Sequence, residues 1–156
     1  MDWYDIIKWL HIIGSTVLFG TGAGTAFQMM MAMRNGEPCV VASVAHHVVI
    51  ADWLFTTPAG IIQPITGITL AYLNGYSLSE PWLLPVYALY LVAFAAWVPV
   101  VWLQHRIRDE ATANATAARP LSKKCRQYYR IWFTLGWPAF IALMVIFWLM
   151  ITRPQF

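Results

Sequence analysis

The chain alternates long uncharged runs with short charged segments. Counted between successive charged side chains, the four longest uncharged runs have 25, 27, 25 and 22 residues. A transmembrane helix needs about 20 predominantly apolar residues to cross the hydrocarbon core of a bilayer. The pattern therefore predicts four membrane-spanning helices, near residues 7–32, 50–73, 82–105 and 130–151.

Each uncharged run is apolar on every face. None has the polar stripe with which a helix of a soluble bundle meets water, and the period-two alternation of a membrane β-barrel strand is absent. Helices satisfy their backbone hydrogen bonds internally, as the bilayer interior requires. We expect an all-α polytopic membrane protein, a four-transmembrane-helix bundle that forms a single integral membrane domain over residues 1–156.

The second predicted span continues an apolar segment, residues 38–51, that precedes it. Joined to residues 52–73, this segment gives a helix of about 36 residues, or ~54 Å at 1.5 Å per residue. Such a helix is longer than the bilayer is thick, so it either projects into the cytoplasm or bends near Asp52 or Pro58. Pro58 and Pro64 each remove a backbone donor, and protein must cover the carbonyls that they free.

Basic residues are distributed unequally between the two sides that four spans create. One side carries Lys8 and Arg153 alone. The other side carries Arg34, Arg106, Arg108, Arg119, Lys123, Lys124, Arg126 and Arg130. Positively charged loops stay in the cytoplasm, so we expect a bacterial inner-membrane protein with both termini periplasmic. Two acidic residues in the opening stretch "MDWYDIIKWL" argue against a cleavable signal peptide, and the first helix is expected to remain.

Composition agrees with this membrane interpretation. Hydrophobic residues make up 60% of the chain and charged residues 11%, whereas about a quarter of the residues of a soluble domain are charged. The net charge of +3 follows from the loop asymmetry and gives no indication of nucleic-acid binding. Cys39 and Cys125 fall in predicted cytoplasmic loops, where thiols stay reduced. No nucleophile elbow, phosphate-binding loop or zinc-protease signature is present.

His11 is the one histidine in the outer half of a predicted span. On a helix it shares a face with the small residues Gly14, Ser15 and Gly22. Ionisable residues within spans are functional by default. One interpretation is a neutral imidazole that ligates haem b, with the small residues leaving room for the macrocycle. The alternative is close helix packing with His11 hydrogen-bonded across the bundle.

The other candidate ligands lie at different depths. His46, His47 and His105 belong near the cytoplasmic face, where they are expected to contact headgroups and water, or to form a second, less favoured ligand set. A haem held by His11 needs its other axial position filled at the outer level. The candidates for that position are Met144, Met150, a water molecule, an open site or His11 of a second subunit in a homodimer.

Asp52 is the acidic residue at the edge of a span, and Arg130 begins another span at a similar depth. A buried carboxylate is costly without a partner, so the two are expected to pair. The pair is either a structural latch or a proton entry point. Arg130 can also anchor the propionate of a bound ligand.

Three stretches resemble known families. These are "KWLHIIGSTVLFGTGAG", "ADWLFTTPAGIIQPITGI" and "YYRIWFTLGWPAFIALMVIFWLMITRP". Over nearly the whole chain they resemble a family of small bacterial four-helix inner-membrane proteins of unknown function. More distantly, they are similar to the HemJ-type membrane protoporphyrinogen oxidases, whose helix-one pattern "K-x-x-H-I-I" carries a haem-associated histidine. That resemblance implies a haem role for His11. This chain departs from the HemJ-type pattern in two places: at the inner end of the first helix, which reads "FQMMMAMR", and in the residues that follow "Y-R-I" in the fourth helix.

Two function classes follow from these patterns. The first is an inner-membrane protein that binds haem b through His11, a redox protein or oxidoreductase with a quinone or porphyrin-like partner. The second is a non-enzymatic accessory protein or a small carrier without haem, in which the broken second span is the permeation element. The lipid bilayer is a partner in both.

Overall fold

The computed structural model describes residues 2–154 and contains helices joined by short connections, with no strand among those residues. The elements in chain order are α1 (Trp3–Asn35), α2 (Pro38–Ala51), the π-helical turn η1 (Asp52–Thr56), α3 (Thr57–Leu73), α4 (Leu83–Thr116) and α5 (Lys123–Thr152). Four long apolar helices qualify as membrane spans by length and composition: α1, the continuous segment Pro38–Leu73, α4 and α5. The prediction of an all-α, four-span bundle is confirmed.

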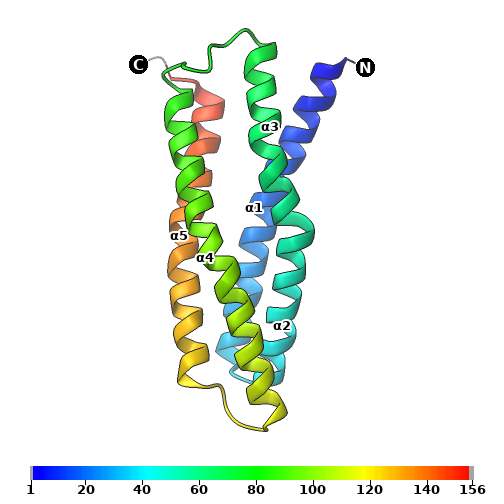
Figure 1. Cartoon of the computed structure of the whole chain (residues 1–156), viewed down its shortest axis with the longest axis vertical. Coiled ribbons are helices and arrows are strands. Elements are labelled where there is room, and N and C mark those ends of the chain that lie inside the picture. The colour runs from blue at the N-terminus through cyan, green and yellow to red at the C-terminus, as the bar shows by residue number, and fades with distance from the viewer. Residues whose placement is uncertain (1, 155–156) are drawn as a thin grey trace.

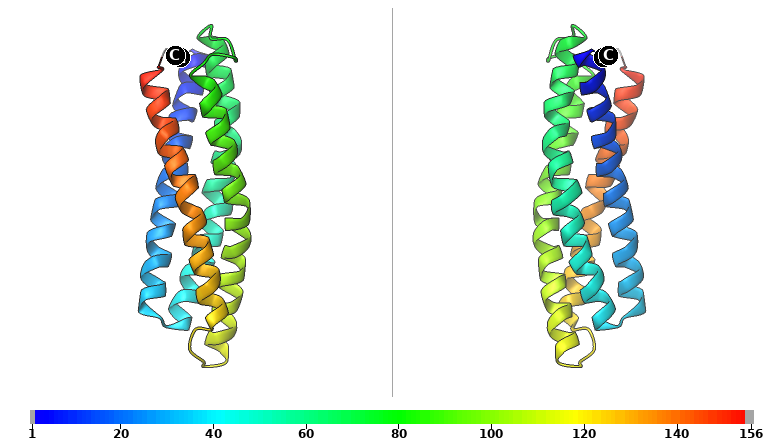
Figure 2. Two further views of the ribbon diagram at one scale, coloured as in Figure 1. Left: turned by 90° about the vertical axis from the view of Figure 1, so that its left-hand side faces the viewer. Right: turned by 90° about the vertical axis from the view of Figure 1, so that its right-hand side faces the viewer.

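The bundle is long and narrow, and α1 begins at the same end at which α5 finishes (Figures 1 and 2). We call this the termini end, and it also carries the connection 74–82. The opposite end, which we call the basic end, carries the connections 36–37 and 117–122. The helices extend beyond the predicted spans, most clearly where α4 continues to Thr116.

Local sequence explains where the helices stop and start. Gly36 has φ 82°, a left-handed conformation open to glycine, and its N–H bonds the carbonyl of Ala32 to close α1. Pro38 then begins α2 at a position where its missing N–H costs nothing. At the other connection of the basic end, the hydroxyl of Ser122 caps α5 by accepting the N–H of Cys125 at 3.0 Å.

The expected long helix is present, and it is interrupted where a bend was expected. Pro38–Leu73 is one helix of 36 residues, and η1 lies within it. In η1 the N–H of Thr57 reaches the carbonyl of Asp52, five residues back, and the Thr57 hydroxyl donates to that carbonyl at 2.9 Å. Further along, Pro64 leaves the carbonyl of Gly60 without its helical donor, and Tyr90 of α4 donates a hydrogen bond to it.

The two halves of the bundle pack differently. In the basic half, α1, α2, α4 and α5 share a buried core that includes Met29, Val41, Ile107 and Cys125. In the termini half, α1 packs against α3 while α4 packs against α5, and Figure 1 shows these two pairs diverging toward the top. Phe19 of α1 reaches Phe140 of α5 at a ring-centroid distance of 5.1 Å.

Large apolar side chains cover the outside of the bundle. Leu54, Leu91, Trp148 and Ile151 are each more than 60% exposed, which in water would be an aggregation hazard. A lipid environment removes that cost, so the surface agrees with the membrane interpretation. Trp82 is buried against Ala71 and Leu83 and serves packing.

Candidate functional site: two polar clusters on one broken helix

The first cluster joins α1 to α3 in the termini half. His11 Nδ1 lies 2.8 Å from the Thr66 hydroxyl oxygen. That oxygen also lies 2.9 Å from the carbonyl of Ile62, which can only accept. The single hydroxyl proton is directed to the backbone, so Nδ1 carries its own proton and donates it to Thr66. Neutral His11 then has its lone pair on Nε2.

Glycines bring the two helices of this cluster together. A Cβ built on Gly14 would lie 2.8 Å from the side-chain oxygen of Gln63. One on Gly67 would lie 3.2 Å from Cε1 of the His11 ring. Gln63 and Thr66 are both buried, at 9% and 7% exposure. The expected space beside Gly14 is therefore filled by Gln63, a residue that the sequence pattern did not single out.

Two other residues of the predicted haem face lie away from that contact. Gly22 is exposed, and a Cβ built there meets no atom within 4 Å. The Ser15 hydroxyl donates to the carbonyl of Ile12 at 2.8 Å. The backbone of α1 is thus open to the surroundings at Gly22 and closed by protein at Gly14.

The predicted alternative ligands do not gather around His11. His46 and His47 are exposed on α2, in the basic half. Met144 is exposed on α5, and Met150 packs beside the Trp82 cluster at the termini end. Across residues 2–154 no three His, Cys, Asp or Glu side chains converge in a way that could hold a metal ion.

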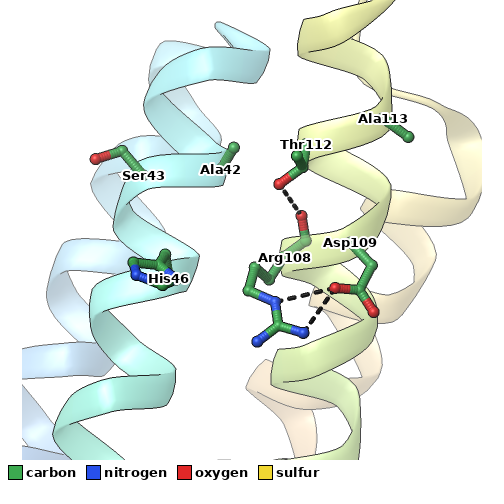
Figure 3. Close-up of a pocket in the computed structure, with 7 residues that line it drawn as sticks. All are labelled: Ala42, Ser43, His46, Arg108, Asp109, Thr112 and Ala113. Carbon is green, nitrogen blue, oxygen red and sulfur yellow. Dashed lines mark hydrogen bonds and ion pairs between the residues drawn. The ribbon is translucent and has the colours of Figure 1, made fainter.

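A shallow groove between α2 and α4 runs along the basic half, with a volume of about 720 Å³. Arg108 is paired there with Asp109 at 2.8 Å. Figure 3 shows His46 on α2 facing this pair across the groove. The residues that line it are Ala42, Ser43, His46, Arg108, Asp109, Thr112 and Ala113.

Arg130 lies in a separate pocket of about 410 Å³ between α1 and α5. The pocket has three arginines over an apolar floor. Its lining consists of Met30, Met33, Arg34, Arg126, Tyr129, Arg130 and Phe133. His11 belongs to the opposite half of the bundle, so Arg130 and His11 do not share one site.

The predicted ion pair between Asp52 and Arg130 is wrong. The ion pairs within residues 2–154 are Arg108–Asp109 and Lys124–Glu110. Arg130 is exposed, whereas Asp52 is buried at 8% exposure. Matched depth does not fix the direction around the bundle in which a side chain points, and these two residues point into different places.

Asp52 instead organises the second polar cluster. The side chains of Thr56, Trp97 and Gln104 surround its carboxyl, and His105 is close enough to act on it electrostatically. Gln104 is 3% exposed. These side chains lie within hydrogen-bonding reach of the Asp52 carboxyl, but four of their buried atoms make no hydrogen bond of good geometry within the described chain: Asp52 Oδ2, Thr56 Oγ1, Trp97 Nε1 and Gln104 Oε1. Buried polar atoms are normally paired, so this concentration calls for an exchangeable partner such as water, a proton or an ion.

Sequence reasoning missed Gln63, Thr66, Trp97 and Gln104. A signal was available for the two glutamines, because a side-chain amide within an apolar span needs partners inside the protein. The other two residues gave none, since Thr and Trp are common in membrane helices.

These features together define the class of protein: a helical membrane protein with four spans, whose polar side chains are gathered at two levels inside the bundle. The chain belongs to the family of predicted integral membrane proteins called DUF2269, which matches residues 5–154. No curated protein and no solved structure matches the chain. The family assignment supports the membrane part of the predictions and carries no cofactor or reaction, and no HemJ-type oxidase is among the matches.

Proposed function

We propose that this protein binds haem b in the bacterial inner membrane through His11 and takes part in electron transfer with a quinone or porphyrin-like partner. The observation that carries the proposal is the hydrogen bond from His11 Nδ1 to Thr66. Metal-ligating imidazoles nearly always donate their other N–H to a fixed acceptor, which sets the tautomer and the ring orientation. Here that acceptor is a buried hydroxyl.

His11 would hold the haem through its Nε2 nitrogen, with Nδ1 bonded to Thr66. A neutral imidazole with its lone pair on Nε2 is a common haem ligand, and haem when bound supplies one-electron chemistry at iron. His11 would hold the group, Thr66 would keep the ring oriented, and the exposed backbone at Gly22 would allow close approach of a flat ligand. The lipid-facing apolar surface would admit a quinone or porphyrin from the bilayer.

The visible spectrum of the detergent-purified protein tests this proposal. After expression with sufficient haem, the wild type is expected to show a Soret band that shifts on reduction with dithionite. His11→Ala should lose stoichiometric haem while still inserting into the membrane. The matched control His47→Ala, which alters the basic half, should keep it. A colourless wild type, or full haem in His11→Ala, would refute His11 ligation.

The proposed orientation places both termini in the periplasm and the basic end in the cytoplasm, from the eight-to-two distribution of Lys and Arg. Reporter fusions after residues 36 and 115 should then read cytoplasmic, and a fusion after residue 78 should read periplasmic. A periplasmic reading at 115 would reverse the orientation.

A second candidate function is a small carrier without haem. One observation favours it: the helix Pro38–Leu73 is interrupted by η1, and Asp52 at that interruption is buried without an ionic partner among the residues that the structure describes. Irregular backbone at membrane depth is tolerated where protein or a cavity covers it, and such places often bind transported ions. A colourless preparation that acidifies or alkalinises the lumen of proteoliposomes would support the carrier.

A further inference from the structure

We propose that Asp52 and His105 form a proton-binding site in the basic half of the bundle, in which His105 passes a proton from the basic end to the Asp52 carboxyl. The proposal deepens the carrier candidate and does not depend on haem. It rests on the placement of the two side chains, on the unpaired atoms around Asp52 and on the absence of a fixed cation within the described residues.

The π-helical turn holds Asp52 inside the bundle. Its backbone carbonyl receives both the N–H and the hydroxyl of Thr57, so an ordinary helical bond is replaced at this residue. π-Helical turns are rare and are frequent at functional sites. Asp52 is 8% exposed. The separate helix that packs against the turn is α1, and it supplies no ionic partner for Asp52 within residues 2–154.

The polar groups around the carboxyl can serve either of its protonation states. The Trp97 N–H, the Thr56 hydroxyl and the Gln104 amide can donate to a carboxylate, whereas a carboxylic acid can donate to an oxygen of Thr56 or Gln104. A guanidinium or ammonium group in contact would hold the carboxyl ionised. No Lys or Arg among residues 2–154 forms an ion pair with Asp52, so proton binding and release both remain open to it.

His105, which follows Gln104 on α4, is the titratable side chain close enough to this carboxyl to act on it electrostatically. The neighbouring segments of α1 and α3 supply no other titratable side chain at this level. No titratable residue occurs in 12–33 of α1 or 57–71 of α3, and His46 and His47 of α2 are exposed. On α4, the Tyr90 hydroxyl is committed to the carbonyl of Gly60.

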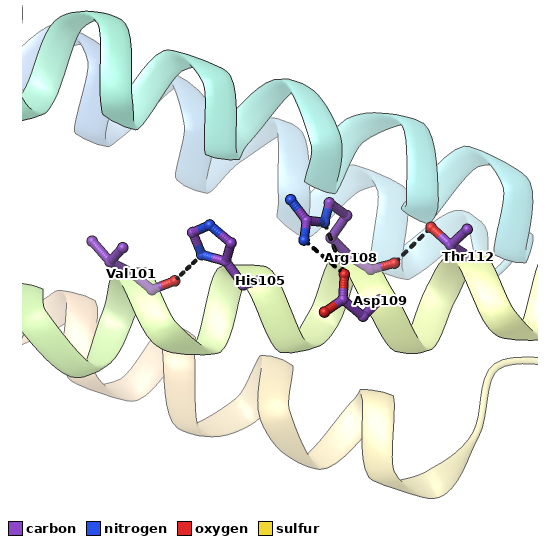
Figure 4. Close-up of polar contacts among 5 residues, drawn as sticks. All are labelled: Val101, His105, Arg108, Asp109 and Thr112. Atoms are coloured by element: carbon purple, nitrogen blue, oxygen red, sulfur yellow. Dashed lines mark hydrogen bonds and ion pairs between the residues drawn. The ribbon is translucent and has the colours of Figure 1, made fainter.

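The orientation of His105 suits a relay. Its Nδ1 lies 2.9 Å from the carbonyl of Val101, which can only accept, so Nδ1–H is the donor. Nε2 is left to exchange protons. Figure 4 shows the ring on the side of α4 that faces α2, one turn before Arg108 and Asp109. His105 is half-buried, so its ring is more open to its surroundings than the buried carboxyl of Asp52 is.

The proton transfer balances without any other reactant. A hydronium ion at the basic end gives a proton to Nε2 and leaves as water, and the imidazole becomes imidazolium while Nδ1–H stays on the Val101 carbonyl. The imidazolium then gives the Nε2 proton to Asp52, directly or through a bridging water. The products are a neutral carboxylic acid and a neutral imidazole, and the transfer can repeat once the Asp52 carboxylic acid has released its proton.

Infrared difference spectroscopy tests the proposal on the full-length protein in phosphatidylcholine nanodiscs, in sodium-free buffer, without added haem. A shift from alkaline to acidic buffer should produce a deuterium-sensitive carbonyl band of a protonated carboxylic acid. Asp52→Asn should remove this band. The control Asp109→Asn, at an exposed carboxylate, should retain it. Should Asp52→Asn fail to fold, Asp52→Glu must move the band in frequency.

The kinetics of the same band test the relay. After a pH jump, His105→Gln should slow its appearance by about 100-fold, because a positioned acid–base group contributes at least that factor. His47→Gln should keep the wild-type rate, and His11→Ala should leave the band in place. Three results would overturn the proposal: no pH-dependent band, a band abolished by sodium at constant pH, or an unchanged rate in His105→Gln.

Discussion

The two polar clusters lie on the same broken helix, roughly 20 Å apart at 1.5 Å per residue. They differ in how their polar atoms are paired. In the termini half, His11 and Thr66 are hydrogen-bonded to each other across a glycine-lined contact between α1 and α3. In the basic half, Asp52 and three neighbouring side chains have buried atoms without protein partners. The first half packs as helix pairs and joins His11 directly to Thr66, with Gln63 Oε1 as its one buried atom without a partner among the described residues. The second half has a full core that encloses four such atoms around Asp52.

This difference separates two uses of polar groups within a membrane. A hydrogen bond between two side chains in a bundle is worth on the order of 1 kcal/mol and holds helices together. A cluster with unfilled hydrogen-bonding capacity contributes less to stability, and it can bind an exchangeable partner such as water, a proton or an ion. By this criterion the His11–Thr66 bond joins two helices, and the Asp52 cluster is the one that fits the proposed exchange site.

The sharpest test of the enclosed basic half compares its two cysteines. Cys125 has no exposed surface in the core, whereas Cys39 is exposed at the start of α2. In single-cysteine variants, Cys125→Ser should leave a thiol that N-ethylmaleimide labels quickly. In Cys39→Ser the remaining thiol is the buried Cys125, which should react about 100-fold more slowly. The core must open locally before the reagent can reach this thiol, and a 100-fold difference corresponds to an opening free energy of about 3 kcal/mol. Mass spectrometry measures the rates. Equal rates in the folded protein would mean that the core of the basic half is loose.

The glycine contact of the termini half is the next largest expected effect. Gly67→Val should push against the His11 ring and destabilise the protein by about 1–3 kcal/mol, the usual cost of overpacking. Gly24→Val is the matched control, since a Cβ at Gly24 meets no atom within 4 Å. Thermal unfolding in detergent, followed by circular dichroism, reports the difference. If both variants melt together, α1 and α3 do not pack closely at His11.

The smallest expected effect concerns the bond that joins the two helix pairs. Tyr90→Phe should cost about 1 kcal/mol, because the Gly60 carbonyl then loses its donor. Tyr87→Phe is a control in which no hydrogen bond of the described structure is lost. In a Pro64→Ala background, which restores a helical N–H to Gly60, the Tyr90→Phe cost should shrink. A double-mutant cycle on unfolding free energies measures this coupling; full additivity would contradict the arrangement.

The architecture could be read from the sequence because the bilayer imposes a strong constraint. Uncharged runs of 22 residues or more predicted four spans. The 36-residue length of the second helix left two outcomes open, a projection into the cytoplasm or a bend near Asp52 or Pro58. The π-helical form of that interruption could not be predicted, since it depends on how Thr57 shares the Asp52 carbonyl once the helices have packed.

The polar sites were harder to predict than the spans. Hydropathy gives the depth of a residue and not its direction, so Asp52 and Arg130 were paired by level although they point into different sites. Gln63, at the contact with Gly14, hardly changes the hydropathy of its span, yet it occupies the space that was expected beside His11. The haem role of His11 itself stays a prediction.

The two-residue link between α1 and α2 has a mechanical consequence. A link of two residues, Gly36 and Glu37, is too short to let the two helices separate at the basic end. Met29 and Ala32 of α1 are also buried in the core there. Since α1 extends about 50 Å from that link at 1.5 Å per residue, any movement of it is a pivot. A tilt of about 5° would displace the far end of α1 by about 4 Å. Helix α1 would thus tilt about the basic end, and His11 lies near the end of α1 that would be displaced most.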